Sequence, residues 1–442
     1  MNARARLEAV PLIVIAISGS PAISRDPPPA KKLIELGWDI PPTSHLRESW
    51  EEIDRSAPFD GLMFRVEAKD DEGRLLSSES AWDARLWKRE WLQGALDDLR
   101  SCRFRRLTSN FVRLNATPGT LDWADDPGWA ALAQKAGHLA WLMAAAGAKG
   151  IAVDFESYGA AQFALDPAKG RTFEETEVLA RRRGRSLVDA IAREQPGAVV
   201  LALWLNSVNL RAGACDDRVA ALAASHYGLL PAFIDGMLDA LPPTMILVDG
   251  CENGYYMDSA EEYLRAAHEI RSWSGAAIRL VSRENRPRYR GQVQCGFGFY
   301  LDMFLNEEGN RYYFPPLDGS RLARLERNLG FARDAADEYV WVYGEQCRWW
   351  GPPRDLPRTV GKGRLWEEAM PGITAAIAYA RDPGEAARRE LAARRDAGTL
   401  ANLVRNPSFE GGAGKPDALD GVGRWQDERV PAGVLDWDAG VG

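Results

Sequence analysis

The 442-residue sequence is poor in histidine and cysteine, with only four and five of these residues respectively. So few histidines leave little material for a histidine metal site or for Ser-His-Asp chemistry. The cysteines are widely spread and include no Cys-x-x-Cys pair, which argues against a zinc ribbon and against a disulfide-dense scaffold. Their odd number leaves at least one free thiol, and in a chain of this length we expect the cysteines to be buried among apolar residues.

Several common functional motifs are missing as well. There is no phosphate-binding loop and no Gly-x-Ser-x-Gly elbow, and His268-Glu269 lacks the second histidine of a metalloprotease helix. Asp70-Asp71-Glu72-Gly73 is typical of a solvated turn rather than of a calcium loop. The 55 basic and 63 acidic residues give a formal net charge of -8, which disfavours a nucleic-acid or anionic-membrane surface. We therefore expect no metal, no cofactor and no nucleic-acid partner, while the oligomeric state stays open.

Tryptophan is the residue in surplus. There are 16 tryptophans, more than the 14 phenylalanines or the 12 tyrosines. Tryptophans are common in cores, but an excess also suits flat apolar ligands such as the faces of sugar rings. If the protein is an enzyme, the composition indicates carboxylate chemistry with aromatic platforms.

Residues 1–24 have the pattern of an export signal. Arg4 and Arg6 form a short basic region, an apolar run follows at residues 10–17, and small residues follow at 18–22. The run is far shorter than the ~20 residues that a membrane span needs, and no other stretch is long enough. A buried N-terminal strand is the alternative. The pattern predicts a secreted or periplasmic protein, with residues 25–30 as a stiff, proline-rich linker.

Short runs rich in β-branched and aromatic residues recur along the chain and predict eight strands. From the second run onward they begin 44 to 49 residues apart. The runs cover residues 33–40, 61–66, 106–116, 150–158, 199–206, 244–256, 292–302 and 339–350. Between them lie segments of helical periodicity, at residues 81–100, 126–148, 172–194, 219–240, 259–273 and 322–336, and a final one runs from 365 to about 403.

Eight strands that alternate with helices predict an α/β fold, a (β/α)8 TIM barrel over residues 31–402. An open, doubly wound sheet is the competing fold, but no glycine-rich dinucleotide turn follows the first strand. Gly296-Phe297-Gly298-Phe299 lies inside a predicted strand and lacks the third glycine of that motif.

Residues 403–442 differ in composition from the rest of the chain, because they are rich in Gly, Pro and Asp. The phrase Asn406-Pro407-Ser408-Phe409-Glu410 resembles the first strand of a β-sandwich carbohydrate-binding module. Such a module needs ~100 residues, whereas about 40 remain. We expect either a truncated module or a tail that packs on the barrel.

In a barrel of this type, catalytic groups project from the C-terminal ends of the strands. Asp154 and Glu156 follow the apolar run of the fourth strand, and residues two apart in a strand face the same side. Neighbouring carboxylates raise the pKa of one partner, which suits an acid that protonates a glycosidic oxygen. The alternative is that one of the two ends the strand and caps the next helix.

Glu345, after the eighth strand, is the best second carboxylate, because glycoside hydrolysis needs an acid on one side of the bond and a nucleophile or base on the other. Pairing with Arg348 as structural support is the alternative. Asp249, Glu252 and Asp302 compete for the second position.

Aromatic and polar residues at the other strand ends are candidates for binding sugar rings and hydroxyls. Each aromatic residue alone fits core packing as well, but together at strand ends they favour a groove. The predicted substrate-binding residues are Trp38, Asp39, Arg65, Asn115, Tyr158, Trp204, Asn206, Asp249, Glu252, Tyr255, Tyr256, Tyr300, Asp302, Trp349 and Trp350.

These features resemble a (β/α)8-barrel glycoside hydrolase. Asp154-Phe155-Glu156 looks like the end of the family 18 signature, although Ala152 stands where that signature has a further Asp. That resemblance implies Glu156 as the acid and Asp154 as the group that orients a substrate acetamido group. A strand-four Glu is also typical of the retaining clan A enzymes, whose nucleophile comes from strand seven, where this chain has Asp302.

The leading hypothesis is a glycosidase that cleaves a poly- or oligosaccharide, with Glu156 as acid, Glu345 as nucleophile or base, and Asp154 tuning Glu156. Three alternatives remain open. One is a non-catalytic carbohydrate-binding protein on a degenerate barrel, another is a substrate-assisted enzyme of the N-acetylglucosaminidase kind, and the third is a lyase or transglycosylase.

Overall fold

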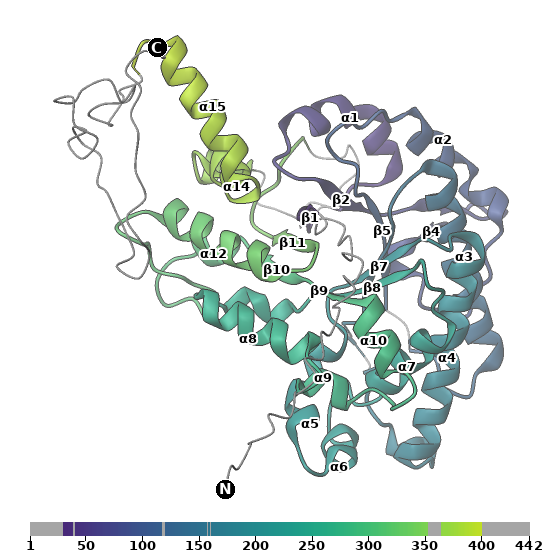
Figure 1. The fold of residues 1–442 in the computed structure, drawn as a ribbon. Coiled ribbons are helices and arrows are strands. Elements are labelled where there is room, and N and C mark those ends of the chain that lie inside the picture. Colours follow the sequence, from purple (N-terminus) through teal and green to yellow (C-terminus); the bar gives the residue numbers. More distant parts are fainter. Residues whose placement is uncertain are drawn as a thin grey trace, which may run out of the picture. The chain divides into compact units, whose positions relative to one another are not determined.

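The computed structural model describes residues 30–38, 40–116, 120–156, 158–159, 161–351 and 364–399 (Figure 1). The predicted export signal, residues 25–29 of the predicted linker, Asp39 and the C-terminal tail lie outside the described residues. The domain boundaries drawn from the sequence therefore stay predictions.

One parallel sheet forms the centre of the molecule. Its strand order is β10-β11-β1-β2-β5-β6-β7-β8-β9, and every neighbouring pair is parallel. The strands are β1 (Lys32–Gly37), β2 (Gly61–Phe64), β5 (Phe111–Asn115), β6 (Gly150–Asp154), β7 (Val199–Ala202), β8 (Ile246–Asp249), β9 (Val293–Cys295), β10 (Phe297–Tyr300) and β11 (Tyr339–Gly344).

Strands β9 and β10 are two parts of one strand, separated only by Gly296. Because β9 pairs with β8 and β10 pairs with β11, this strand joins the two ends of the sheet and closes it into a ring. Strands adjacent along the chain are then adjacent around the ring. The protein is a (β/α)8 TIM barrel, which confirms the fold predicted from the eight evenly spaced runs.

Gly296 is required by the close approach of the strands on both sides of it. A Cβ at this position would lie 2.8 Å from the carbonyl oxygen of Tyr339 and 3.0 Å from a side-chain methyl of Val248. Its amide also donates to the carbonyl oxygen of Asp249, at 2.8 Å. The Gly-Phe-Gly-Phe phrase therefore marks the place where the barrel closes.

The helices surround this ring, and α3 and α4 lie side by side on its outside (Figure 1). Helices α3, α8 and α12 pack directly against strands of the ring. The helices are α1 (Thr43–Ser56), α2 (Gln93–Ser101), α3 (Asp126–Ala146), α4 (Phe173–Glu194), α5 (Leu210–Ala214), α6 (Arg218–Ala223), α7 (Leu230–Ala240), α8 (Ala260–Arg271), α9 (Ala276–Arg279), α10 (Arg286–Gln292), α11 (Asp302–Leu305), α12 (Arg321–Ala335), α13 (Trp366–Ala369), α14 (Ile373–Arg381) and α15 (Pro383–Asp396).

The predicted helices at residues 126–148, 172–194, 259–273 and 322–336 correspond to α3, α4, α8 and α12. Three other predictions need correction. Residues 81–92 form turns and a 3-10 helix, residues 219–240 divide into α6 and α7, and the last segment divides into α13, α14 and α15. Proline provides a physical reason for two of the divisions, since α7 and α15 each begin with a proline in their first turn.

The segment before α2 was misread because it contributes large apolar side chains to the core without being helical. Trp82 is fully buried there and packs edge-on against Trp129 of α3, with ring centroids 5.7 Å apart. Trp129 in turn stacks on Trp123 at 4.9 Å. These three rings show that part of the tryptophan surplus belongs to the core.

Helix α1 was not anticipated at all. Its sequence is mostly polar, and its apolar side chains Leu46, Trp50 and Ile53 follow the spacing of one helix face.

A small antiparallel hairpin, β3 (Glu67–Lys69) and β4 (Leu75–Ser77), follows the second barrel strand. The turn predicted at Asp70–Gly73 joins its strands. The side chain of Asp70 is buried, however, and accepts hydrogen bonds from the backbone amides of Glu72 and Arg74 at 3.1 and 2.8 Å.

All five cysteines are free thiols. Four of them are buried, as expected, whereas Cys215 is exposed. Among the described residues, no helix has the length and apolar character to cross a bilayer, and no group of His, Cys, Asp and Glu side chains is arranged to hold a metal ion.

The seam at Gly296 gives a stability prediction. Replacing Gly296 with Ala should lower the free energy of unfolding by about 1–3 kcal/mol, because the new methyl group must displace strand backbone. Urea denaturation followed by tryptophan fluorescence measures the change. Gly197→Ala is the matched control, since no atom lies within 4 Å of its added Cβ. Equal midpoints for the two variants would contradict the role given to Gly296.

Candidate active site

A cavity of about 520 Å³ lies at the C-terminal ends of the barrel strands. Among the described residues its lining is dominated by acids and tyrosines, with one arginine, Arg113 of β5. The acidic residues are Asp154, Glu156, Glu252, Asp302 and Glu345. The tyrosines are Tyr158, Tyr255, Tyr300, Tyr312 and Tyr343.

The cavity brings together eight of the residues that the sequence singled out. All three predicted catalytic residues are among them, together with five predicted substrate-binding residues. They are Asp154, Glu156, Tyr158, Glu252, Tyr255, Tyr300, Asp302 and Glu345. Their chemical roles stay predictions.

Asp154 ends β6 and is held from two directions. One carboxylate oxygen accepts the backbone amide of Glu156 at 2.8 Å, and the other accepts a guanidinium N–H of Arg113. Arg113 also reaches Glu79, with 3.5 Å between Nε and Oε1. Burial raises the pKa of Glu79, and the charge of Arg113 opposes that shift. Arg113 thus links two acids, of which only Asp154 lines the cavity.

Sequence reasoning missed Arg113 and Glu79. A signal was present for Arg113, because it stands inside the apolar run Phe-Val-Arg-Leu-Asn of a barrel strand. A charge in such a position needs a buried partner of opposite sign. No comparable signal marked Glu79, which lies in a 3-10 helix (Ser78–Ser80) after the hairpin.

Glu156 is half-buried two residues beyond Asp154. Burial raises the pKa of its carboxyl, and the negative charges of Asp154 and Glu345 act in the same direction. A hydrogen bond with Tyr158 and the charge of Arg113 oppose the shift. The carboxyl of Glu156 therefore holds its proton to a higher pH than an ordinary glutamate does.

Glu345 follows β11 directly, and the tyrosine two residues before it orients its side chain. The hydroxyl of Tyr343 donates to Oε1 of Glu345 at 3.0 Å. The backbone amide of Glu345 donates to Asp302 at 3.2 Å. Because side chains alternate along a strand, Trp341, Tyr343 and Glu345 all face the cavity.

Asp302 supports this loop from the end of the seventh strand. Its side chain is buried, and it accepts backbone amides of both Glu345 and Gln346. Burial raises the pKa of Asp302 to about 6, against the lowering effect of these donors. Its oxygens face the backbone of the next loop, which makes it a support for Glu345.

Glu252 enters the cavity from the loop after β8. Burial raises the pKa of its carboxyl to about 8, and the charges of Glu156 and Asp154 add to the shift. No hydrogen bond or ion pair joins this carboxyl to another side chain or amide in the described part of the chain.

Nine of the described residues predicted to bind sugar do not line this cavity. Seven of the nine are buried or half-buried elsewhere. They are Arg65, Asn115, Trp204, Asn206, Asp249, Trp349 and Trp350.

Asp249 shows what these residues do instead. Its carboxylate is fully buried and accepts the backbone amides of Leu205 and Ser207, both at 2.9 Å. Arg65 pairs with Glu67 at 2.7 Å, and the ring of Trp349 packs on Phe59 with centroids 5.0 Å apart. Trp204, Asn206, Trp349 and Trp350 lie two to six residues beyond the ends of β7 and β11, at Ala202 and Gly344, where loop contacts and not strand alternation decide which way a side chain turns.

Two predicted aromatic residues are exposed. Trp38 is 54% exposed just beyond β1, and Tyr256 is 49% exposed in the loop after β8. Tyr256 stacks on Tyr312, a lining residue, with centroids 5.9 Å apart. Tyr256 thus extends the aromatic wall outward, while Asp39, next to Trp38, lies outside the described residues.

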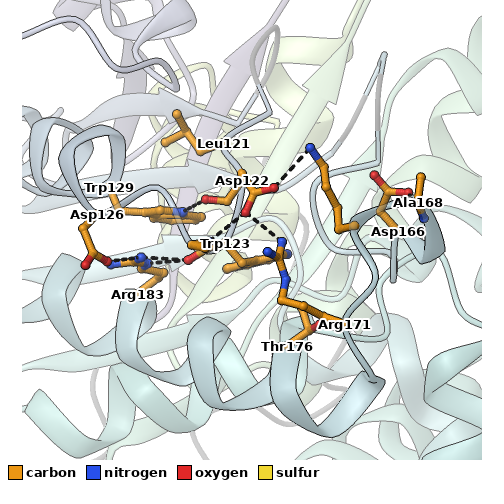
Figure 2. Close-up of polar contacts among 12 residues, drawn as sticks. Leu121, Asp122, Trp123, Asp126, Trp129, Asp166, Ala168, Arg171, Thr176 and Arg183 are labelled. Atoms are coloured by element: carbon orange, nitrogen blue, oxygen red, sulfur yellow. Dashed lines mark hydrogen bonds and ion pairs between the residues drawn. The ribbon is translucent and has the colours of Figure 1, made fainter.

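A second cavity, of about 380 Å³, lies between the loop after β5 and the loop before α4. Figure 2 shows that Asp122 of this lining is paired with basic side chains. Asp122 binds Arg171 at 2.7 Å and Lys169 at 3.1 Å, while Arg183 donates to the carbonyl oxygen of Trp123 and to Asp126. These contacts clamp the two loops together on the flank of the barrel.

No protein-family model matches the chain, and no curated protein matches it in sequence. Among solved structures, it is similar to GH5_18 from Streptomyces cattleya in complex with GlcNAc, at 14% identity over 86% of this chain and 84% of that chain, with a TM-score of 0.40. It is similar to a Bacteroidetes-affiliated GH5 cellulase at 10% identity over 76% and 84%, with a TM-score of 0.39. It also resembles a pneumococcal GH20 exo-β-D-N-acetylglucosaminidase module at 11% identity over 85% and 92%, with a TM-score of 0.37. Sequence identities of 10–14% and TM-scores of 0.37–0.40 carry no argument about function, which therefore rests on this chain's own residues.

The triad of Glu79, Arg113 and Asp154 gives a second stability prediction. Arg113→Met should lower the free energy of unfolding by about 3–5 kcal/mol at neutral pH, because the buried Asp154 and the half-buried Glu79 lose their counter-charge. The deficit should shrink as the pH falls below neutral, since burial already raises the pKa of Glu79 and this acid takes up a proton once its counter-charge is gone. Urea denaturation at several pH values measures both effects.

Arg265→Met is the matched control for this variant. Arg265 pairs with Glu261 at 2.5 Å on the exposed face of α8, so its loss should cost less than ~1 kcal/mol. Equal losses for the two variants, or a deficit in Arg113→Met that grows on acidification, would show that the triad is not the stabilising element described.

Proposed function

We propose that the protein is a glycoside hydrolase that cleaves a glycosidic bond in a poly- or oligosaccharide by a two-carboxylate mechanism. The observation that carries the proposal is the presence of Glu156 and Glu345 in one cavity at the strand ends, close enough for Glu345 to raise the pKa of Glu156. Glycoside hydrolysis needs such a pair, one member as acid and the other as nucleophile or base.

Glu156 is the proposed general acid. A carboxyl that donates a proton to a leaving-group oxygen has to hold that proton near the working pH, and burial raises its pKa in the required direction. Asp154 lies beside it, and its negative charge also raises the pKa of Glu156.

Glu345 is the proposed nucleophile or base. The Tyr343 hydroxyl and the contact of its own amide with Asp302 fix its side chain and its backbone. A carboxylate held in place across the cavity from Glu156 is oriented either to attack the anomeric carbon or to activate a water molecule that does so.

The tyrosines supply the surface on which a sugar could rest. Tyr255 and Tyr300 stack with centroids 4.9 Å apart, and Tyr300 and Tyr343 stack at 5.4 Å. Aromatic faces pack against the apolar faces of sugar rings, and their hydroxyls bind sugar oxygens. This combination favours a carbohydrate over a wholly apolar ligand.

The engagement of Asp154 favours the two-carboxylate mechanism over the substrate-assisted one. In the substrate-assisted alternative, Asp154 would hold the acetamido group of the substrate. Both of its oxygens already accept protein donors, and its side chain is only 1% exposed. Its geometry suits support of Glu156.

The direct test replaces each acid with its amide. Wild-type protein incubated with a panel of poly- and oligosaccharides should shorten at least one of them. Glu156→Gln and Glu345→Gln should each lower turnover of that glycan by roughly 10²- to 10⁴-fold, because the amide neither gives a proton nor attacks. Chromatography of the products with time measures the rates.

Glu51→Gln is the control, because Glu51 is exposed on α1, a helix of the outer layer. It should keep wild-type turnover. If Glu156→Gln and Glu345→Gln both keep it as well, the assigned roles are wrong. A wild-type protein that binds a glycan without shortening it would instead indicate a carbohydrate-binding protein. The anomeric form of the first product distinguishes Glu345 as nucleophile from Glu345 as base.

A further inference from the structure

Glu252 is the one carboxyl of the cavity whose function the two-carboxylate scheme leaves open. It begins a short 3-10 helix, η5 (Glu252–Tyr256), directly after the turn that follows β8. The side chain lines the same cavity as Glu156 and is half-buried there. It therefore has access both to the proposed acid and to a bound sugar.

The turn that presents Glu252 is held in an unusual backbone conformation. Cys251, the residue before it, has φ of 35° and ψ of 71°, a left-handed conformation that non-glycine residues rarely adopt. Such strain persists only where the surroundings over-determine it, and it gathers at functional sites.

Contacts on both sides of the turn impose this conformation. The carbonyl oxygen of Cys251 accepts the amides of Gly254 and Gly298, at 2.9 and 3.3 Å. The indole of Trp341 donates to the carbonyl oxygen of Gly250 at 2.8 Å. The position of Glu252 is therefore fixed by the barrel and not by contacts of its own carboxyl.

The charges around that carboxyl are negative. Glu156 and Asp154, at the end of β6, are the charged groups that act on it most, and Tyr255 on its own helix is un-ionised at neutral pH because burial raises its pKa. The cation of the cavity lining, Arg113, is already bound by Asp154 and Glu79. A carboxyl in such surroundings retains its proton, since ionisation would add a negative charge that no free cation among the described lining residues neutralises.

We propose that Glu252 carries its proton in the free site and binds the substrate as a hydrogen-bond donor to a sugar oxygen, beside the bond that Glu156 protonates. This inference rests on the proposed function for its substrate class, a glycan. The hydroxyl of a neutral carboxylic acid donates a strong hydrogen bond, which the other carboxylates of the site cannot offer when ionised. Raising the pH through the pKa of Glu252, about 8, converts the donor into an anion and removes that contact.

The site therefore fits an uncharged sugar that presents an oxygen able to accept this hydrogen bond. Above the titration of Glu252, an anion at this place would meet Glu156, Asp154 and the ionised Glu252 together. Neutral sugars, including N-acylated ones, fit the site, whereas uronic acids and sulfated sugars do not.

Binding measured in a slowed background isolates this contact from the titration of Glu156. In Glu345→Gln, the dissociation constant for an oligosaccharide of the hydrolysed or bound glycan should rise roughly 10-fold between about pH 7 and about pH 9, because only the protonated site binds. In Glu345→Gln combined with Glu252→Gln, binding at neutral pH should stay within about threefold and lose this pH dependence, because the amide donates at every pH. Glu252→Ala in the same background should weaken binding roughly 10-fold already at neutral pH.

Two outcomes would overturn the proposal. In one, Glu252→Gln binds no better than Glu252→Ala, so that donation is not what matters. In the other, the weakening at alkaline pH persists when Glu252 is Gln, so that another group causes it.

Thermal unfolding tests the retained proton without any ligand, and so stays informative if no glycan is hydrolysed. A carboxyl whose pKa is higher in the folded than in the unfolded chain destabilises the fold progressively as the pH rises from its unfolded to its folded pKa. The Tm of Glu252→Gln relative to wild type should therefore increase between about pH 5 and about pH 8 and then level off. The exposed control Glu51→Gln should show a constant difference. A difference for Glu252→Gln that does not change with pH would mean that Glu252 is ionised in the free site.

Discussion

The site depends on one constraint, the closure of a parallel sheet into a ring. Because every strand runs the same way, the residues that follow β6, β8, β10 and β11 all arrive at one mouth. The chain places an acid at each of these ends, and the arginine among the described lining residues is Arg113 of β5. Burial and the nearby like charges raise the pKa values of Glu156, Glu252 and Asp302 to different extents. The unequal proton affinities that acid catalysis needs follow from the fold and its charge imbalance.

The alternation of strand-like and helical segments predicted the barrel well, because both signals are local. Burial on both faces makes each barrel strand a continuous apolar run, and the spacing of the runs gives the topology. The place of closure was beyond this reasoning. Gly296 is explained by contacts with Tyr339 and Val248, which lie far from it in sequence.

The contrast between local sequence signals and contacts made far along the chain also separates the site residues that were predicted from those that were not. Asp154 and Glu156 were found because they sit where a strand ends, and the period of two still applies to them. Trp204 and Trp350 were placed in a groove because they stand at the ends of predicted strands, but each lies beyond its observed strand, where tertiary contacts decide which way a side chain turns. Arg113 was visible in principle, as a charge inside an apolar strand.

The length of the side chain accounts for how the acids divide their work. Asp154, Asp249 and Asp302 each accept backbone amides from the loops beside them, because a short side chain at a strand end lies close to the adjoining backbone. These aspartates fix loop geometry in the manner of helix-capping residues. The glutamates are one methylene longer and reach past the backbone into the cavity, where Glu156 and Glu345 meet tyrosine hydroxyls.

This division explains why an Asp at a strand end of this barrel is a poor candidate for the reacting group, even where its pKa is raised. Asp302 occupies the strand-seven position that the clan A resemblance assigns to a nucleophile, yet its oxygens are committed to the amides of Glu345 and Gln346. Moving Asp302 toward a substrate would release the loop that carries Glu345. The proposed reacting carboxylate and its support therefore belong to different strands, with Asp302 after the seventh and Glu345 after the eighth.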